Sequence, residues 1–158
     1  MKEKNETKLL DKVGWQILEE MQQNARISYA ELGRRVAMST PAVMDRISRM
    51  EQAGIISGYR VELDPASIGY PILAFFRISV VGGLLSRVIE VARESPEVLE
   101  CHRVTGADSF IMKICVSSIE HLETFIDQLR PYVTATSAVV LSSAVTRRII
   151  RPRSKPRA

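Results

Sequence analysis

Residues 72–80 read Ile-Leu-Ala-Phe-Phe-Arg-Ile-Ser-Val, and this stretch decides the fold of the second half of the chain. Successive side chains of a strand point to opposite faces, so the stretch divides into two sets. One set is wholly apolar and belongs to a core: Ile72, Ala74, Phe76, Ile78 and Val80. The other set is mixed: Leu73, Phe75, Arg77 and Ser79. The alternation predicts a strand with one face on a hydrophobic core.

The sequence that follows supplies the other elements of an α+β domain. Amphipathic helices are predicted over residues 85–94 and 119–129, each ending before a proline. Further strands are predicted over three apolar stretches, residues 98–104, 110–116 and 133–141. The order is β-α-β-β-α-β, the ferredoxin-like plan, in which both helices cover one face of an antiparallel sheet.

The sheet face that no helix covers also carries apolar side chains. Leu73 and Phe75 lie on it, and the alternation in the strand 110–116 adds Ile111 and Cys115. A monomer would expose this patch to water, which calls for a partner. We therefore expect a homodimer whose interface includes Leu73, Phe75 and Ile111. The alternative is that a further strand or the C-terminal tail covers this face.

The first third of the chain predicts three short helices. Apolar residues recur at helical spacing over residues 9–21. Ser28 is a candidate N-cap of a second helix, with Glu31 three residues later as in a capping box, and this helix ends near Ala37. Ser39 then caps a third helix. A short helix, a three-residue turn and a third helix with one buried stripe form a helix-turn-helix motif, a DNA-binding arrangement.

The third helix is the candidate DNA-reading element. Val43, Ile47 and Met50 form its buried stripe, and Gly54 closes it. The opposite face would enter the major groove of double-stranded DNA. The residues expected to contact DNA are Ser39, Thr40, Pro41, Ala42, Asp45, Arg46 and Arg49. The alternative is a plain three-helix bundle with solvated arginines. Beyond the helix, the alternation in residues 55–63 predicts a strand.

A third candidate site is the loop Thr105-Gly106-Ala107-Asp108-Ser109 between two predicted strands. A glycine lets backbone N–H groups approach a small ligand, and the Asp108 carboxylate can pair with an ammonium group. We therefore expect a small-molecule effector at Gly106, Ala107, Asp108 and Ser109. The alternative is a simple turn, because glycine and aspartate are common turn residues.

The charge is unevenly distributed along the 158 residues. Residues 1–65 carry ten basic and ten acidic side chains, and residues 66–146 carry six and eight. The last twelve residues carry six basic side chains and no acidic one, so the net charge of +4 comes from the tail. Residues 151–157 of this tail are also interrupted by prolines, and we expect them to be disordered.

Several classes of function find little support in the sequence. No apolar run is long enough to span a membrane, and no signal peptide is evident, so we expect a cytoplasmic protein with no membrane partner. Two cysteines and two histidines lack the spacing of a metal site, and we expect neither a metal nor a cofactor. Cys101 and His102 point to opposite faces of a strand and cannot act together, so we expect no enzyme.

The order and spacing of many short segments resemble the Lrp/AsnC family of feast/famine transcription regulators over nearly the whole chain. The segments are Leu10-Asp11, Ile17-Leu18, Asn24-Ala25-Arg26-Ile27-Ser28, Glu31-Leu32, Ser39, Val43, Arg46-Ile47, Met50-Glu51, Gly54-Ile55-Ile56-Ser57-Gly58-Tyr59, Leu63-Asp64-Pro65, Ile68-Gly69, Pro96-Glu97-Val98 and Thr105-Gly106-Ala107-Asp108-Ser109. One departure is Gly14, where the family usually has an aspartate.

The resemblance implies a DNA-binding domain, a strand linker and a ligand-sensing domain. We place them at residues 1–56, 57–70 and 71–146, followed by the basic tail 147–158. The resemblance also implies dimers formed through the sheets, further assembly into octamers, and an amino acid or related molecule bound near Gly106 to Ser109. The competing hypothesis is a ferredoxin-like small-molecule-binding protein or enzyme whose helical unit mediates protein contacts.

Overall fold

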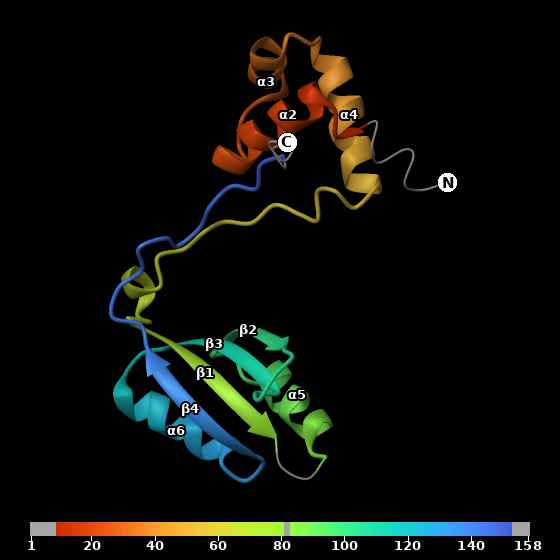
Figure 1. Ribbon diagram of the computed structural model, residues 1–158. Helices are drawn as coiled ribbons and strands as arrows, with labels where there is room; N and C mark the ends of the chain where they lie inside the picture. The colour runs from red at the N-terminus through yellow and green to blue at the C-terminus, as the bar shows by residue number, and fades with distance from the viewer. Residues whose placement is uncertain (1–8, 81–82, 153–158) are drawn as a thin grey trace, which may run out of the picture. The chain divides into compact units, whose positions relative to one another are not determined.

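The computed structural model describes residues 9–80 and 83–152, which fall into two compact units (Figure 1). The first unit comprises the chain up to Val61 together with the segment from Val145 onward, and the second comprises Glu62–Ala144. Residues 81 and 82, which follow the first strand of the sheet, lie outside the described residues.

The described part of the first unit contains three helices: α2 (Lys12–Gln23), α3 (Tyr29–Val36) and α4 (Thr40–Gln52). Each follows an N-cap whose side chain accepts a hydrogen bond from a backbone N–H of the first turn. Ser28 accepts from Glu31 at 3.1 Å and Ser39 accepts from Ala42 at 3.4 Å, which confirms both predicted caps. Asp11 caps α2, so this helix begins at Lys12 rather than at residue 9.

A tight turn sets α4 against α3. Ala37 adopts the left-handed conformation with φ of 53°, and the Met38 N–H donates to the Gly33 carbonyl at 2.9 Å. A side chain at position 33 would place its Cβ 2.6 Å from the Met38 carbonyl oxygen, so only glycine allows this turn. The helices enclose a core made of Leu9, Ile17, Met21, Leu32, Val36, Val43, Ile47 and Met50.

The predicted strand over residues 55–63 is wrong. After α4 the chain contains only the 3-10 helix η1 (Ala66–Ile68) before the first strand of the sheet. Tyr59, Val61 and Leu63 alternate as a strand would, but all three are exposed. A strand needs a neighbour to accept and donate its backbone hydrogen bonds, and no other segment of the described chain pairs with this one.

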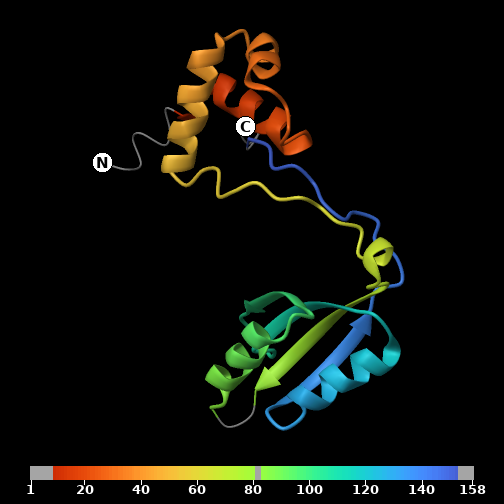
Figure 2. The ribbon, with the colours of Figure 1, turned by 180° about the vertical axis from the view of Figure 1, so that it is seen from behind.

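The second unit has the predicted ferredoxin-like order. It contains β1 (Ile72–Val80), α5 (Leu85–Glu94), β2 (Val98–Arg103), β3 (Phe110–Val116), α6 (Ile119–Leu129) and β4 (Val133–Val139). The strands lie in the order β2-β3-β1-β4, and each neighbouring pair is antiparallel. α5 and α6 cover the same face of the sheet (Figure 2). β1 is thus a central strand, paired with β3 on one side and β4 on the other.

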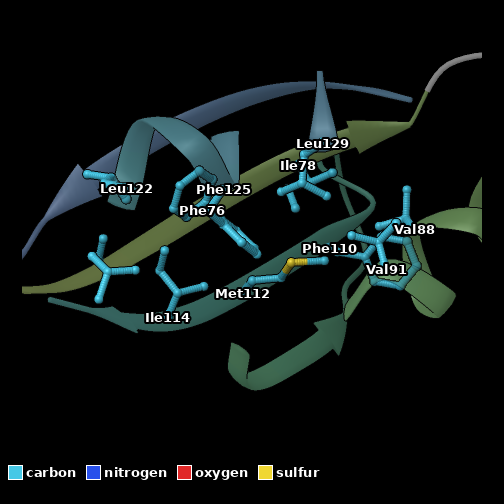
Figure 3. Close-up of a cluster of buried hydrophobic side chains, with 12 residues drawn as sticks. Phe76, Ile78, Val88, Val91, Phe110, Met112, Ile114, Leu122, Phe125 and Leu129 are labelled. Carbon is cyan, nitrogen blue, oxygen red and sulfur yellow. The ribbon is translucent and has the colours of Figure 1, made fainter. Parts of the chain in front are cut away.

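The predicted core face of β1 is buried under the two helices (Figure 3). Ala74, Phe76 and Ile78 are fully buried, and the rings of Phe76 and Phe125 meet edge to face at 5.6 Å. Side chains of β3, α5 and α6 complete the cluster: Val88, Val91, Phe110, Met112, Ile114, Val116, Leu122, Phe125 and Leu129.

The segment after β4 belongs to the first unit from residue 145 onward. Ile150 is held there by two hydrogen bonds to the side chain of Gln22. Residues 153–158 of the tail lie outside the described residues. Among the helices that the structure describes, none has the length and apolar character to cross a membrane.

We predict that Gly14→Ala destabilises the first unit, although alanine normally favours a helix over glycine by about 1 kcal/mol. Gly14 is buried in α2, and a Cβ there would collide with the Leu9 carbonyl oxygen. Overpacking of this kind costs about 1–3 kcal/mol. Urea unfolding followed by the fluorescence of Trp15 measures the effect, with the exposed Gln16→Ala as control. Equal or greater stability of Gly14→Ala would contradict the prediction.

Candidate functional site

α4 has one buried stripe and one outer face, as predicted. Val43, Ile47 and Met50 are buried, which fixes the rotation of the helix about its axis. The opposite side carries exposed side chains near the start of the helix and along it, namely Thr40, Pro41, Asp45 and Arg49. Ala42 is half-buried, and the Ser39 hydroxyl caps the helix. A helix of this kind can enter a major groove with small residues at its leading end.

Arg46 lies differently from the other expected DNA-binding residues. Its side chain is only 19% exposed, and its guanidinium donates to the Asp11 carboxylate and, at 3.3 Å, to the Leu9 carbonyl oxygen. The hydrogen bond from the Gly14 N–H and the contact with Arg46 lower the pKa of Asp11 below its usual value. Arg46 therefore ties the middle of α4 to the start of α2.

The other three arginines of this region also have acidic neighbours. Arg35 donates to Glu20 at 2.6 Å and to Glu31 at 2.9 Å, which links α3 to α2. Arg34 pairs with Glu31 as well, and Arg49 lies 3.8 Å from Asp45 on the exposed side of α4. Exposed ion pairs of this kind are weak. The positive charge of these four arginines is therefore partly compensated within the unit.

Met44 is a candidate contact that the sequence analysis did not include. It is 49% exposed, and it lies four residues after Thr40, on the same side of α4. An apolar side chain at the surface of a DNA-reading helix can contact the methyl group of thymine. The signal was present in the sequence, because Met44 lies outside the stripe of Val43, Ile47 and Met50.

The loop of residues 105–109 is fastened to the end of β1. The Ser109 N–H donates to the Ile78 carbonyl at 2.7 Å, and the Ser109 hydroxyl accepts from the Val80 N–H at 3.2 Å. The Ser79 hydroxyl donates to the Ala107 carbonyl at 3.2 Å. Gly106 has a φ of 111°, a conformation that side chains rarely adopt. The structure therefore brings the four expected effector residues into one ordered turn.

Asp108 has a partner that the sequence analysis did not identify. The Arg77 guanidinium, on the outer face of β1, donates to the Asp108 carboxylate at 2.8 Å. The arginine is mostly exposed and the aspartate less so. Together they present a cation, a carboxylate and the backbone of a glycine turn at one place. These are the groups that a zwitterion needs, since its carboxylate and its ammonium each require an opposite charge.

The uncovered face of the sheet is partly as expected. Phe75 is 40% exposed, whereas Leu73 and Ile111 are half-buried. Cys115 is buried, so its expected place in the exposed patch is wrong. The chain at Tyr70 covers it, and the Cys115 thiol donates to the Tyr70 carbonyl at 3.3 Å.

The described residues also bear on metal binding and on cysteine chemistry. Within residues 9–80 and 83–152, no three potential metal-ligating side chains gather at one point. Burial raises the pKa of both the Cys101 and the Cys115 thiol. A raised pKa keeps a thiol in its protonated, unreactive form at neutral pH.

Comparisons with known proteins match both units. The Lrp/AsnC ligand binding domain matches residues 73–150, and a winged helix-turn-helix DNA-binding domain matches residues 10–57. The HTH-type transcriptional regulator LrpC of Bacillus subtilis is 31% identical over 87% of this chain and 96% of its own length. The proline dehydrogenase transcriptional activator of Rhodobacter capsulatus is 34% identical over 88% of this chain and 94% of its own.

Solved structures agree with these matches. The structure of Bacillus subtilis LrpC has a TM-score of 0.83 and covers 87% of this chain and 99% of LrpC. A transcriptional regulator of Neisseria meningitidis, solved as a complex with L-methionine, has a TM-score of 0.84. It is 29% identical, and the match covers 89% of this chain and 96% of that one.

Proposed function

The chain belongs to the Lrp/AsnC family, and we propose that it is a homo-oligomeric regulator that reads DNA with α4 and senses an amino acid at the loop of residues 105–109. It is a DNA-binding transcriptional regulator of the Lrp/AsnC type. The main support for DNA reading by α4 is the rotation of this helix about its axis, because its buried stripe leaves the opposite face free for a DNA groove. We place the protein in the cytoplasm, where a regulator meets chromosomal DNA.

The exposed face of α4 supplies the proposed base and phosphate contacts. Thr40 and Pro41 at its start are small enough to lie near base edges, while Met44 and Asp45 follow one turn later. Arg49, which is exposed and only weakly paired with Asp45, can reach a phosphate or a guanine. Arg46 supports this surface by holding α4 in place, and the DNA contact expected for it stays a prediction.

The uncovered sheet face supports a dimer. Phe75 is a large exposed aromatic side chain in the middle of a central strand. Leu73 precedes it by two residues, and Ile111 lies diagonally across from it on β3, opposite Arg77. A two-fold axis through this face would bury the same surface of both copies. The dimer would also supply the two α4 helices that a symmetric DNA site requires. Further assembly of dimers into an octamer is part of the same proposal.

The effector site is proposed at the Arg77–Asp108 pair. A zwitterionic amino acid can place its carboxylate on the Arg77 guanidinium and its ammonium on Asp108, next to the backbone of the Gly106 turn. The Neisseria meningitidis relative in complex with L-methionine supports an amino acid as the ligand class. Binding would change DNA affinity only by as much as the amino acid favours one state of the protein over another.

We predict that Arg46→Ala mainly lowers stability, whereas Arg49→Ala mainly weakens DNA binding. Arg46→Ala removes a charged donor from Asp11 and should lower the free energy of unfolding by about 1.5–3 kcal/mol. Arg49→Ala should change stability by less than about 0.5 kcal/mol. It should still weaken DNA binding, by about 1–3 kcal/mol if Arg49 contacts a base.

Urea unfolding and fluorescence anisotropy with DNA from the chain's own promoter region separate the two effects. If Arg49 contacts a phosphate instead, the salt dependence of binding falls by about 0.9 in the log–log slope. Wild-type affinity and slope in Arg49→Ala would remove this residue from the DNA-binding surface.

We predict that Phe75→Asp produces a folded monomer. Phe75 is already 40% exposed in the single chain, so the chain tolerates a charge there, whereas a buried dimer interface does not. Sedimentation velocity measures the assembly state. Leu84→Asp is the matched control, because Leu84 is 41% exposed but lies at the start of α5, and it should remain dimeric. A well-folded wild-type monomer at micromolar concentration would exclude this interface.

We predict that one or more of the twenty amino acids stabilise the wild-type protein in a thermal shift assay. At a concentration of about 100 times its dissociation constant, a ligand adds about 2.7 kcal/mol of stability. Asp108→Asn should abolish the response, because it removes the partner of the ligand's ammonium group, and should leave DNA binding without ligand intact. Asp127→Asn, at an exposed pair on α6, is the control. An unchanged response in Asp108→Asn would show that the site lies elsewhere.

A further inference from the structure

The side chain of Gln22 attaches the C-terminal segment to the first unit. Gln22 donates from its amide nitrogen to the Ile150 carbonyl at 2.9 Å, and its amide oxygen accepts from the Ile150 N–H at 2.8 Å. The Gln22 carboxamide therefore pairs with both the N–H and the carbonyl of Ile150, as the backbone of a neighbouring strand would. The segment runs up to α2 in both views of the chain (Figures 1 and 2).

The C-terminal segment adds positive charge to the first unit. Residues 1–61 carry ten basic and eight acidic side chains, which amounts to +2. Residues 145–158, which belong to the same unit, add six basic side chains and no acidic one. The unit therefore has a formal charge of +8 with its C-terminal segment. The helices alone would give a much weaker electrostatic attraction to DNA.

The C-terminal cations also differ from those of the helices. Each of the four arginines between positions 34 and 49 has an acidic neighbour. Arg148 and Arg151, on either side of Ile150, are exposed and form no ion pair with any described residue. Their guanidinium groups are therefore available to phosphate oxygens, which accept bidentate hydrogen bonds from arginine.

The position of Gln22 gives these cations a place near DNA. Gln22 lies in the last turn of α2, directly before the short turn that leads to the Ser28 cap of α3. α3 is the first helix of the helix-turn-helix pair, and in this motif the first helix crosses the DNA backbone while the second enters the groove. A basic segment fixed beside this turn is therefore close to phosphates rather than to base edges.

We propose that the C-terminal segment is a DNA-backbone arm: Gln22 anchors Ile150, and Arg148 and Arg151 bind phosphates that flank the bases read by α4. This inference rests on the proposed DNA-reading role of α4. The arm strengthens binding to any sequence and carries no base preference, because phosphate contacts do not distinguish bases.

The test compares three full-length variants with the wild type. R148Q/R151Q removes the two charges, Gln22→Leu breaks the anchor and keeps every charge, and Gln23→Leu is the matched control at an exposed neighbouring glutamine. Affinity is measured against salt concentration on a random-sequence duplex and on DNA from the chain's own promoter region. Sedimentation velocity confirms that each variant assembles as the wild type does.

We expect R148Q/R151Q to lower the log–log salt slope by about 0.9 for each phosphate that the two arginines neutralise in the wild type, equally on both duplexes. Gln22→Leu should weaken binding to both duplexes without changing the preference for the promoter DNA, and Gln23→Leu should match the wild type. An unchanged salt slope in R148Q/R151Q would exclude phosphate binding by the two arginines. Wild-type affinity in Gln22→Leu would exclude the anchoring role of Gln22. A loss of binding that altered assembly explains would exclude that role as well. Wild-type protein that binds neither duplex would instead overturn the proposed function itself.

Discussion

The alternation of side chains along β1 is the constraint on which the second unit depends. β1 pairs with β3 and β4, so both of its edges are occupied and only its two faces remain. One face is buried under α5 and α6 and forms the core around Phe76. The other face carries Phe75, where we place the dimer contact, and Arg77, which donates to Asp108 in the loop where we propose the effector site. A shift of one residue in register would exchange these faces and remove core, interface and site together.

The first unit depends in a similar way on the periodicity of a helix, α4. The buried stripe of α4 determines which side chains face outward, and the Arg46 contacts with Asp11 and Leu9 fix the helix against α2. The unit is nearly neutral without its C-terminal segment. Specificity would therefore come from the outer face of α4, and much of the general attraction to DNA from arginines beyond β4.

The sequence predicted the second unit closely, because the apolar side chains of each element there recur at a regular spacing and each element has a clear end. It failed over residues 55–63, where the period of a strand is present but no described segment of the chain pairs with it. Helical periodicity placed Arg46 on a flank of α4 without showing that Leu9 and Asp11 lie beside it. The pairs Arg77–Asp108 and Gln22–Ile150 join residues 31 and 128 positions apart, which no local pattern reveals.

In the proposed dimer, the uncovered face of the sheet joins two copies, so that two α4 helices read DNA together. A footprint of the wild-type protein on DNA from its own promoter region tests this arrangement. We expect two protected segments on the same side of the duplex, with centres about 34–36 Å apart or a multiple of that distance. A single short protected segment, formed at saturating protein, would contradict it.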